Sequence, residues 1–190
     1  MELKVLTDKT LKLPASVLTI GALDGVHKGH QTLILRAKKR AKELNVPLVV
    51  YTFDPPPRVY FKKSTLQLTP LSEKLKWLSL LGVDYVMVAP FNAKYMEREV
   101  NSFLRELADL HPLEIWEGED FQFGKNRGGD VNTLRQHFSV KVLEPIRCSS
   151  GEIISSSRIR LLLMEGMCIQ AEQLLGWKTL SPDLTGGNYL

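Results

Sequence analysis

The chain of 190 residues contains only two cysteines, Cys148 and Cys168. Two thiols cannot build a disulfide framework, and such a low number is typical of a reducing compartment. The sequence also lacks any apolar run near the roughly 20 residues that a transmembrane helix needs. The first 13 residues mix charged with apolar side chains, so they have no signal-peptide core. We therefore expect a cytoplasmic protein with no membrane partner.

Two common nucleotide-binding signatures are missing as well. There is no Gly-x-Gly-x-x-Gly turn of the dinucleotide oxidoreductases and no Gly-x-x-x-x-Gly-Lys-Ser/Thr phosphate loop. These absences disfavour a dehydrogenase and a P-loop kinase. The net charge is only +4, and the densest basic cluster, at 36–42, has apolar residues at helical spacing and no interleaved aromatics. We interpret this cluster as a solvated helix face and expect no nucleic-acid partner.

What the sequence does contain is a regular alternation of short apolar runs and helical patterns. With 44% hydrophobic residues, the chain is long enough for one domain with a sizeable core. We predict strands at 17–20, 47–53, 85–89, 113–116 and 140–145. We predict helices at 31–44, 72–81 (capped by Ser72), 98–110, 131–137, 156–165 and 169–175. This order predicts an α/β fold, a Rossmann-like doubly wound parallel sheet that binds ligands at the carboxyl ends of its strands.

The most informative segment is 21–30, which reads Gly-Ala-Leu-Asp-Gly-Val-His-Lys-Gly-His. It lies between the first predicted strand and the helix at 31–44, so it supplies unpaired backbone N–H groups and the positive end of a helix dipole to an anion. Three glycines allow close approach of a ligand, and His27 and His30 can face one side of the turn. Spacing alone leaves a solvated surface pair equally open. Zinc is disfavoured, because no third Cys or His lies nearby.

Three further segments could carry chemistry. The segment 154–160, Ile-Ser-Ser-Ser-Arg-Ile-Arg, opens a predicted helix with hydroxyls and arginines, which suit phosphate oxygens but also an ordinary serine cap. The segment 116–130 combines a carboxylate, two phenylalanines and a glycine-rich loop. The segment 52–57, Thr-Phe-Asp-Pro-Pro-Pro, ends the second predicted strand.

Taken together, these segments resemble the motifs of the prokaryotic FAD synthetases. That family is the FMN adenylyltransferase module of the bifunctional riboflavin kinase/FAD synthetase family, within the His-x-Gly-His nucleotidyltransferase superfamily. The similarity covers roughly residues 15–177. Five positions depart from the family pattern: Trp116 and Glu117 stand where small or apolar residues are common, Leu23 replaces Phe, Ser157 replaces Thr, and Pro56 replaces His. The last change removes a hydrogen-bond donor near the expected flavin and phosphate site.

The resemblance implies the reaction of ATP with FMN to give FAD and pyrophosphate, the final step of FAD biosynthesis. The catalytic residues would be His27, His30 and Arg160. The nucleotide-binding residues would be Gly21, Asp24, Gly25, Lys28, Gly29, Ser155, Ser156, Ser157 and Arg158. The flavin-binding residues would be Phe53, Pro55, Asn92, Asp120, Phe121, Phe123 and Arg127. Mg²⁺ would bind through the ATP phosphates, and no residue is assigned as a metal ligand.

The resemblance also bears on domain organisation. Residues 1–180 would form the FAD synthetase domain and 181–190 a short tail, which is too short for a riboflavin kinase domain. We therefore expect no riboflavin kinase activity. The chain would be either a single-function adenylyltransferase, with a separate kinase supplying FMN, or a piece of a longer protein. Two other functions stay open. One is a related adenylyl- or cytidylyltransferase with a different phosphate acceptor, and the other is a flavin or nucleotide sensor without catalysis.

Overall fold

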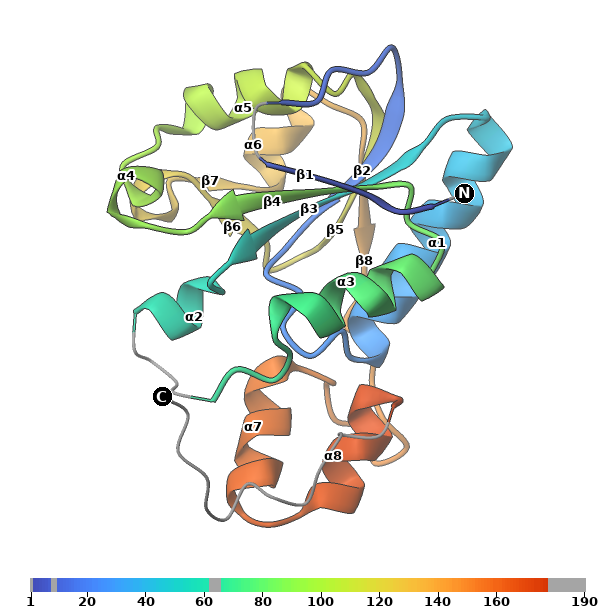
Figure 1. The fold of residues 1–190 in the computed structure, drawn as a ribbon, viewed down its shortest axis with the longest axis vertical. Coiled ribbons are helices and arrows are strands. Elements are labelled where there is room, and N and C mark those ends of the chain that lie inside the picture. Colours follow the sequence, from blue (N-terminus) through green and yellow to red (C-terminus); the bar gives the residue numbers. More distant parts are fainter. Residues whose placement is uncertain (1, 8–9, 62–65, 178–190) are drawn as a thin grey trace.

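A six-stranded parallel sheet forms the centre of the computed structural model, which describes residues 2–7, 10–61 and 66–177 (Figure 1). The strand order is β1-β4-β3-β2-β5-β8. The strands are β1 (Lys4–Thr7), β2 (Ser16–Ile20), β3 (Leu48–Asp54), β4 (Tyr85–Pro90), β5 (Pro112–Gly118) and β8 (Val140–Leu143). All neighbouring pairs in this sheet are parallel. The predicted α/β, Rossmann-like parallel sheet is therefore confirmed.

The sheet is wound in two directions from its centre. The chain builds β2, β3 and β4 outward on one side, then returns to place β5 and β8 on the other side of β2. The order of the strands thus reverses between β2 and β5. In open α/β sheets a crevice forms at such a switch point, outside the carboxyl ends of the strands.

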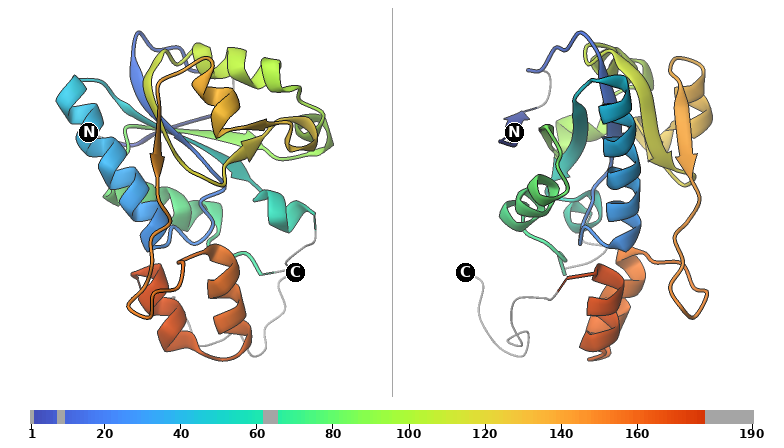
Figure 2. Two further views of the ribbon diagram at one scale, coloured as in Figure 1. Left: turned by 180° about the vertical axis from the view of Figure 1, so that it is seen from behind. Right: turned by 90° about the vertical axis from the view of Figure 1, so that its right-hand side faces the viewer.

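Helices cover both faces of the sheet (Figures 1 and 2). The longer helices are α1 (Lys28–Leu44), α3 (Leu71–Leu80), α5 (Val100–Ala108), α7 (Ser156–Met164) and α8 (Cys168–Leu175). The short elements are α2 (Pro57–Tyr60), α4 (Ala93–Met96), α6 (Val131–Arg135), a 3₁₀ turn at Lys125–Arg127, and the strands β6 (Gln122–Phe123) and β7 (Gly129–Asp130). One core cluster contains side chains of α1 and α3, and the other contains side chains of α5 and α6. A third, smaller cluster joins α7 to α8 at one end of the molecule.

Strand β2 shows why the sequence gives a two-sided core. All five of its residues are buried. Leu18 and Ile20 belong to the core cluster with α5, whereas Val17 belongs to the cluster with α1. Alternate side chains of a strand point to opposite faces, so a strand covered on both faces reads as a continuous apolar run.

Several predicted boundaries are wrong by a few residues. Helix α1 begins at Lys28, three residues earlier than predicted, so His27 is its N-cap. Ser72 does not cap α3, because the helix begins at Leu71 after Pro70, whose position makes no side-chain capping bond. The sequence prediction also missed the edge strand β1, the helices α2 and α4, and the hairpin of β6 and β7.

Two other predictions concern the C-terminal tail and membrane-spanning helices. The predicted tail at 181–190 lies outside the described residues. Along the parts of the chain that the structure describes, no helix combines the length and the apolar character that crossing a bilayer requires.

Candidate active site

The turn after β2 is held in an unusual backbone conformation at the start of α1. Leu23, Gly25 and Val26 all have positive φ angles, of 49°, 88° and 35°. The Gly25 amide donates to Thr69 Oγ1 at 2.6 Å, and a Cβ at position 25 would lie 2.9 Å from Leu68 Cδ1. Glycine is therefore required at position 25 both by its φ angle and by close packing.

Two histidines stack at the N-terminus of α1. Their ring centroids lie 3.6 Å apart with the planes inclined by 17°. His27 Nδ1 accepts a bond from the His30 amide at 3.4 Å. A Cβ at Gly29 would lie 3.1 Å from the His27 ring, so the glycine leaves room for this imidazole. The structure thus brings the two predicted catalytic histidines together.

Burial keeps both imidazoles neutral near pH 7. It lowers the pKa of His27 to about 4; a backbone hydrogen bond opposes the shift, and the charge of Arg160 adds to it. Burial also lowers the pKa of His30 well below its usual value, with smaller contributions from the charges of His27 and Lys74. The buried Nδ1 atom of His30 has no hydrogen-bond partner among the described residues. A buried polar atom without a partner is uncommon in folded proteins, and it marks this end of α1 as a place for a polar ligand.

Asp24 and Arg160 pair with each other across 136 residues of sequence. The pair joins Asp24 Oδ2 to Arg160 Nη2, and both side chains are almost fully buried. Asp24 Oδ1 also accepts from the amides of Leu68 and Thr69, at 3.0 and 3.1 Å. Arg160 Nε donates to the carbonyl of Leu66 at 2.8 Å. The predicted catalytic Arg160 therefore reaches the turn, and its guanidinium bonds to protein groups that hold the turn in place.

The N-terminus of α7 lies against the same turn. Ser156 Oγ donates to the Asp24 carbonyl at 2.7 Å, and Ser155 Oγ caps the helix by accepting from the Arg158 amide at 3.3 Å. The Arg158 guanidinium pairs with Glu152 and donates to Cys148 Sγ at 3.2 Å. These contacts, first from Arg158 and then from Ser150, lower the pKa of the Cys148 thiol to about 6. The structure thus brings together the two segments that were predicted to bind phosphates.

The sequence prediction missed several residues that fix this arrangement. Gln31 Nε2 donates to the carbonyls of Val26 and Leu175, both at 2.7 Å. Trp177 Nε1 donates to the Gly25 carbonyl at 3.1 Å. The Lys74 ammonium lies buried beneath the turn and donates to the Ala22 carbonyl at 2.8 Å. No sequence pattern signalled these contacts, because all of them except the bond between Gln31 and Val26 join residues that lie far apart in the chain.

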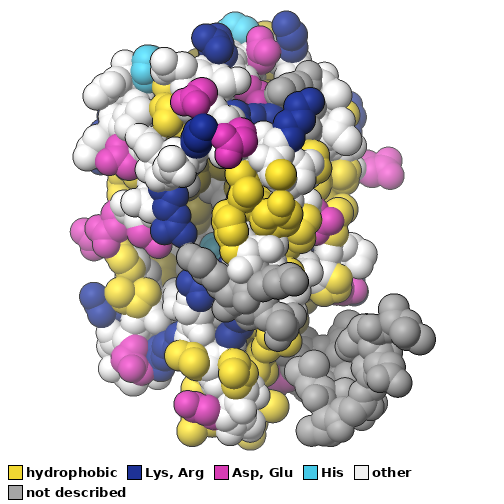
Figure 3. Space-filling model, turned by 90° about the vertical axis from the view of Figure 1, so that its left-hand side faces the viewer, with side chains coloured by type: hydrophobic (Ala, Val, Ile, Leu, Met, Phe, Trp, Pro, Cys, Tyr) yellow, Lys and Arg dark blue, Asp and Glu magenta, His cyan; other side chains and the backbone are white. Residues whose placement is uncertain are grey.

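The predicted flavin-binding residues lie at the carboxyl ends of β3, β4 and β5. Phe53 packs edge-on against Phe91 and Tyr95, with centroid distances of 6.0 and 5.4 Å. Phe121 stacks on Phe123 at 5.6 Å. Figure 3 shows hydrophobic side chains gathered on the face that carries α2 and α4 in Figure 1.

These two aromatic groups are joined through the core. Tyr51 contacts both Phe53 and Phe103, at 5.6 and 5.4 Å, and Phe103 contacts Phe123 at 5.4 Å. All of these residues belong to, or pack against, the core cluster with α5. An apolar floor therefore runs along one face of the sheet, from the end of β3 to the loop after β5.

The remaining predicted flavin-side residues have distinct positions. Asn92 caps α4 by accepting from the Tyr95 amide at 2.9 Å. Pro55 follows a cis peptide bond at the end of β3. Asp120 and Arg127 are exposed, and Arg127 Nη1 lies 3.5 Å from the Gln122 side-chain oxygen. Asn92 and Pro55 thus shape backbone at the strand ends, whereas Asp120 and Arg127 are open to solvent.

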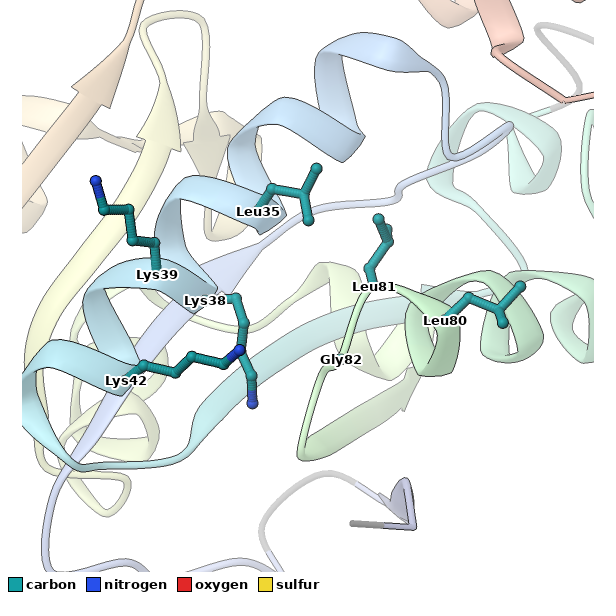
Figure 4. Close-up of a pocket in the computed structure, with 7 residues that line it drawn as sticks. All are labelled: Leu35, Lys38, Lys39, Lys42, Leu80, Leu81 and Gly82. Atoms are coloured by element: carbon teal, nitrogen blue, oxygen red, sulfur yellow. The ribbon is translucent and has the colours of Figure 1, made fainter.

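A surface pocket of about 370 Å³ lies elsewhere, between α1 and the end of α3 (Figure 4). It is lined by Leu35, Lys38, Lys39, Lys42, Leu80, Leu81 and Gly82. The Lys38 ammonium forms an ion pair with Asp84 at 2.7 Å. No predicted site residue lines this pocket, so it is separate from the histidine pair.

The sequence profile of one family covers most of the described chain. The profile of the FAD synthetases matches residues 9–158. The chain belongs to the FAD synthetase family. Its domain is therefore homologous to FMN adenylyltransferase modules, and the resemblance that the motifs indicated is confirmed.

Relatives of the chain differ in length. A Geobacillus thermodenitrificans protein, provisionally named a bifunctional riboflavin kinase/FMN adenylyltransferase, is 48% identical over 88% of this chain and 93% of its own. A Listeria monocytogenes FAD synthetase is 36% identical over 85% of this chain and 69% of its own. For the Escherichia coli (strain K12) bifunctional riboflavin kinase/FMN adenylyltransferase, the identity is 34% over 84% of this chain, which spans about half of that protein (54%).

A solved structure supports the same fold. A Streptococcus pneumoniae protein described as a macrolide-efflux protein has a TM-score of 0.81 and 26% identity to this FAD synthetase domain. The match covers 93% of this chain and 62% of that one. The overall fold is therefore shared with a structure of low sequence identity.

Proposed function

We propose that this chain is an FMN adenylyltransferase that converts MgATP and FMN to FAD and pyrophosphate. The observation that carries the proposal is the pair of neutral, stacked histidines at the N-terminus of α1, in a chain of the FAD synthetase family. Their position at the carboxyl end of β2 is where a phosphate ligand is expected in an open α/β sheet.

The reaction needs no covalent intermediate with the protein. An oxygen of the FMN phosphate attacks the α-phosphorus of ATP, a new P–O bond forms, and the bond to the bridging oxygen of the β-phosphate breaks. That electron pair leaves with pyrophosphate. The task of the protein is to align the two phosphates and to stabilise the charge that develops between them.

The residues of the turn are suited to that task. In the proposed complex, the N–H groups of His27 and His30 donate to phosphate oxygens, and the positive end of α1 attracts the triphosphate. A neutral imidazole keeps one N–H group that can donate to a phosphate oxygen. The hydroxyls of Ser156 and Ser157 and the Arg158 guanidinium would hold the leaving pyrophosphate from the α7 side.

Asp24 and Arg160 form a buried pair that supports the turn. Because Arg160 is bonded to Asp24 and to the Leu66 carbonyl, we assign it to the alignment of α7 with the turn. We still expect Arg160→Ala to weaken ATP binding, since the turn would lose that support. An unchanged dissociation constant for ATP would remove Arg160 from the site.

On the other side, the apolar floor between Phe53 and Phe123 is suited to the flavin ring. Mg²⁺ would arrive with the ATP phosphates as part of the substrate. Among the described residues, no group of three or more His, Cys, Asp or Glu side chains is arranged to hold a metal ion.

The decisive experiment is a product assay by chromatography. Purified protein is incubated with FMN and MgATP, in air and under reducing anaerobic conditions, and FAD and pyrophosphate are quantified. FAD in either condition supports the proposal and identifies the redox state of FMN that is accepted. Binding of FMN and ATP without any FAD would favour the sensor function, and absence of both binding events would favour another phosphate acceptor.

Two substitutions connect this assay to the site. We expect His27→Ala and His30→Ala each to lower turnover by on the order of 100-fold or more while the fold is retained. His137→Ala is the matched control, because His137 is exposed after α6 and outside the site. Near-normal turnover in a folded His27 or His30 variant would overturn the proposed role of the pair.

A further inference from the structure

Lys74 is a fully buried cation on α3, and no other lysine among the described residues is buried. Its Nζ atom donates to the Ala22 carbonyl at 2.8 Å, to Thr52 Oγ1 at 3.3 Å and to the Phe53 carbonyl at 3.2 Å. All three acceptors are uncharged. A buried ammonium is costly unless it is paired, so its presence here calls for an explanation.

The three acceptors belong to the two halves of the candidate site. Ala22 lies in the turn that carries the histidines, whereas Thr52 and Phe53 end the neighbouring strand β3. Thr52 Oγ1 also donates to the Ala22 carbonyl at 3.2 Å. One ammonium thus ties the nucleotide side of the crevice to the start of the aromatic, flavin side.

The charge of Lys74 is only partly balanced. Among the described residues, no carboxylate forms an ion pair with it. Asp24 and Asp54 act on it from a longer distance, and Asp24 already pairs with Arg160. The titratable group that faces it from α1 is His30.

Because no described carboxylate forms an ion pair with Lys74, its protonation is sensitive to new charge that binds nearby. Burial lowers the pKa of Lys74 to about 8, and the carboxylates of Asp24 and Asp54 partly oppose that shift. A polyphosphate at the histidine turn would bring several negative charges close to a poorly solvated ammonium. An added negative charge favours the charged form of a lysine.

We propose that Lys74 is a positioning residue whose ammonium is completed by the charge of the bound nucleotide, so that nucleotide binding draws a proton onto Lys74 and fixes Ala22 against the end of β3. The inference rests on the proposed function only in taking the anion to be a nucleoside triphosphate. Occupation of the nucleotide side is thereby linked to the geometry of the flavin side through the buried Nζ atom of Lys74.

The size of the proton uptake follows from the titration. A group with a pKa of about 8 is about half protonated at pH 8, so binding would take up as much as about half a proton per nucleotide. At pH 7 the same group is already about nine-tenths protonated, and the uptake would fall to about a tenth. This decrease between pH 8 and pH 7 is the signature of Lys74.

Isothermal titration calorimetry measures this uptake directly. MgATP without FMN is titrated into the full chain at pH 8 and pH 7, in pairs of buffers with different ionisation enthalpies. The dependence of the binding enthalpy on the buffer enthalpy gives the number of protons. The series uses a Cys148→Ser background, because the thiol beside Arg158 also titrates near the α7 side of the site.

Three variants make the test specific. Lys74→Met keeps the length of the side chain without a charge, and Lys74→Arg keeps the charge without a titration in this range. Lys76→Met is the matched control, since Lys76 lies on the same helix, is exposed and approaches Glu73 at 3.9 Å. We expect uptake at pH 8 in the parent chain and in Lys76→Met, and none in Lys74→Arg or Lys74→Met.

The positioning role has a separate readout in steady-state kinetics. If Lys74 fixes Ala22 against β3, Lys74→Met should raise the KM for FMN and lower kcat, whereas Lys74→Arg should restore part of both. Circular dichroism and thermal melting establish that each variant is folded. If Lys74→Met does not fold, the pH dependence in the parent chain and the result for Lys74→Arg still decide the question.

The outcomes separate this inference from the proposed function. Nucleotide binding without proton uptake at pH 8, or equal uptake in Lys74→Arg, overturns the role of Lys74 and leaves the proposed function intact. A chain that makes FAD but shows unchanged kinetics in folded Lys74→Met also overturns it. Absence of MgATP binding overturns the proposed function and this inference together.

Discussion

The buried pair of Asp24 and Arg160 gives the sharpest prediction for stability. In Asp24→Asn, one amide oxygen can still accept from the Leu68 and Thr69 amides, but the group that faces Arg160 no longer carries a negative charge. The side chains of the pair are only 3% and 6% exposed, so solvent cannot replace the lost partner. Breaking one side of a buried pair typically costs about 3–5 kcal/mol. Because two of the three hydrogen bonds to Asp24 remain, we expect the lower end, about 3 kcal/mol.

Urea unfolding at pH 7, followed by tryptophan fluorescence, measures this loss. The matched control is Asp109→Asn, which breaks an exposed pair with Lys12 at 3.6 Å and should change the free energy of unfolding by about 0.5 kcal/mol or less. In the double variant Asp24→Asn/Arg160→Met, the buried charge is removed as well, so the total loss should be smaller than the sum of the two single losses. A loss below about 1 kcal/mol for Asp24→Asn would refute the argument that this pair holds α7 on the turn.

Three further predictions test single features of the site. Gly29→Ala would place a Cβ 3.1 Å from the His27 ring, so turnover should fall strongly while the melting temperature changes little. A variant as active as the parent chain would contradict the tight packing. In the folded chain the pKa of His27 is about 4, below its value in the unfolded chain. Its contribution to stability, on the order of 3 kcal/mol, should therefore be lost as the pH falls from about 6.5 to 4. In urea unfolding, His27→Gln should show a weaker dependence of stability on acid pH. Burial raises the pKa of Glu117, which accepts from the Ile20 amide at 2.5 Å, so stability should decrease as the pH rises above the usual range of a carboxyl group. The free energy of unfolding of Glu117→Gln should therefore increase relative to that of the parent chain between pH 5 and pH 8. A constant difference between the two would count against this.

The central strands could be predicted from the sequence because of how they are buried. Strands β2 and β3 are covered on both faces, so their side chains form the continuous apolar runs that the sequence shows. Strand β1 is different, because three of its four residues are exposed and only its pairing with β4 makes it a strand. Its four residues are too few and too exposed to show the continuous apolar run or the alternation from which a strand is predicted.

The location of the site was predictable, whereas its internal contacts were not. A glycine-rich turn between a strand and a helix predicts a candidate phosphate site, and the structure brings the rings of His27 and His30 together there. Asp24 was predicted to serve the nucleotide, but the structure shows it bonded to Arg160, 136 residues away. Lys74 follows a glutamate on an amphipathic helix, a context typical of solvated lysines, and only the arrangement of two strand ends buries it.

The arrangement of charge in the turn has a consequence for the proposed reaction. The imidazoles of His27 and His30 are neutral, whereas the cations Lys74 and Arg160 are buried and bonded to residues of the turn. Exposed cations would bind substrate and product phosphates almost equally well, and binding the ground state tightly does not raise the rate of the chemical step. Neutral donors on His27 and His30, together with the fixed positive charges of Lys74 and Arg160, favour the transition state, in which the negative charge is greatest. Substitutions of His27 and His30 should therefore affect mainly kcat, whereas substitutions of Lys74 and Arg160 should affect binding, stability and kcat together.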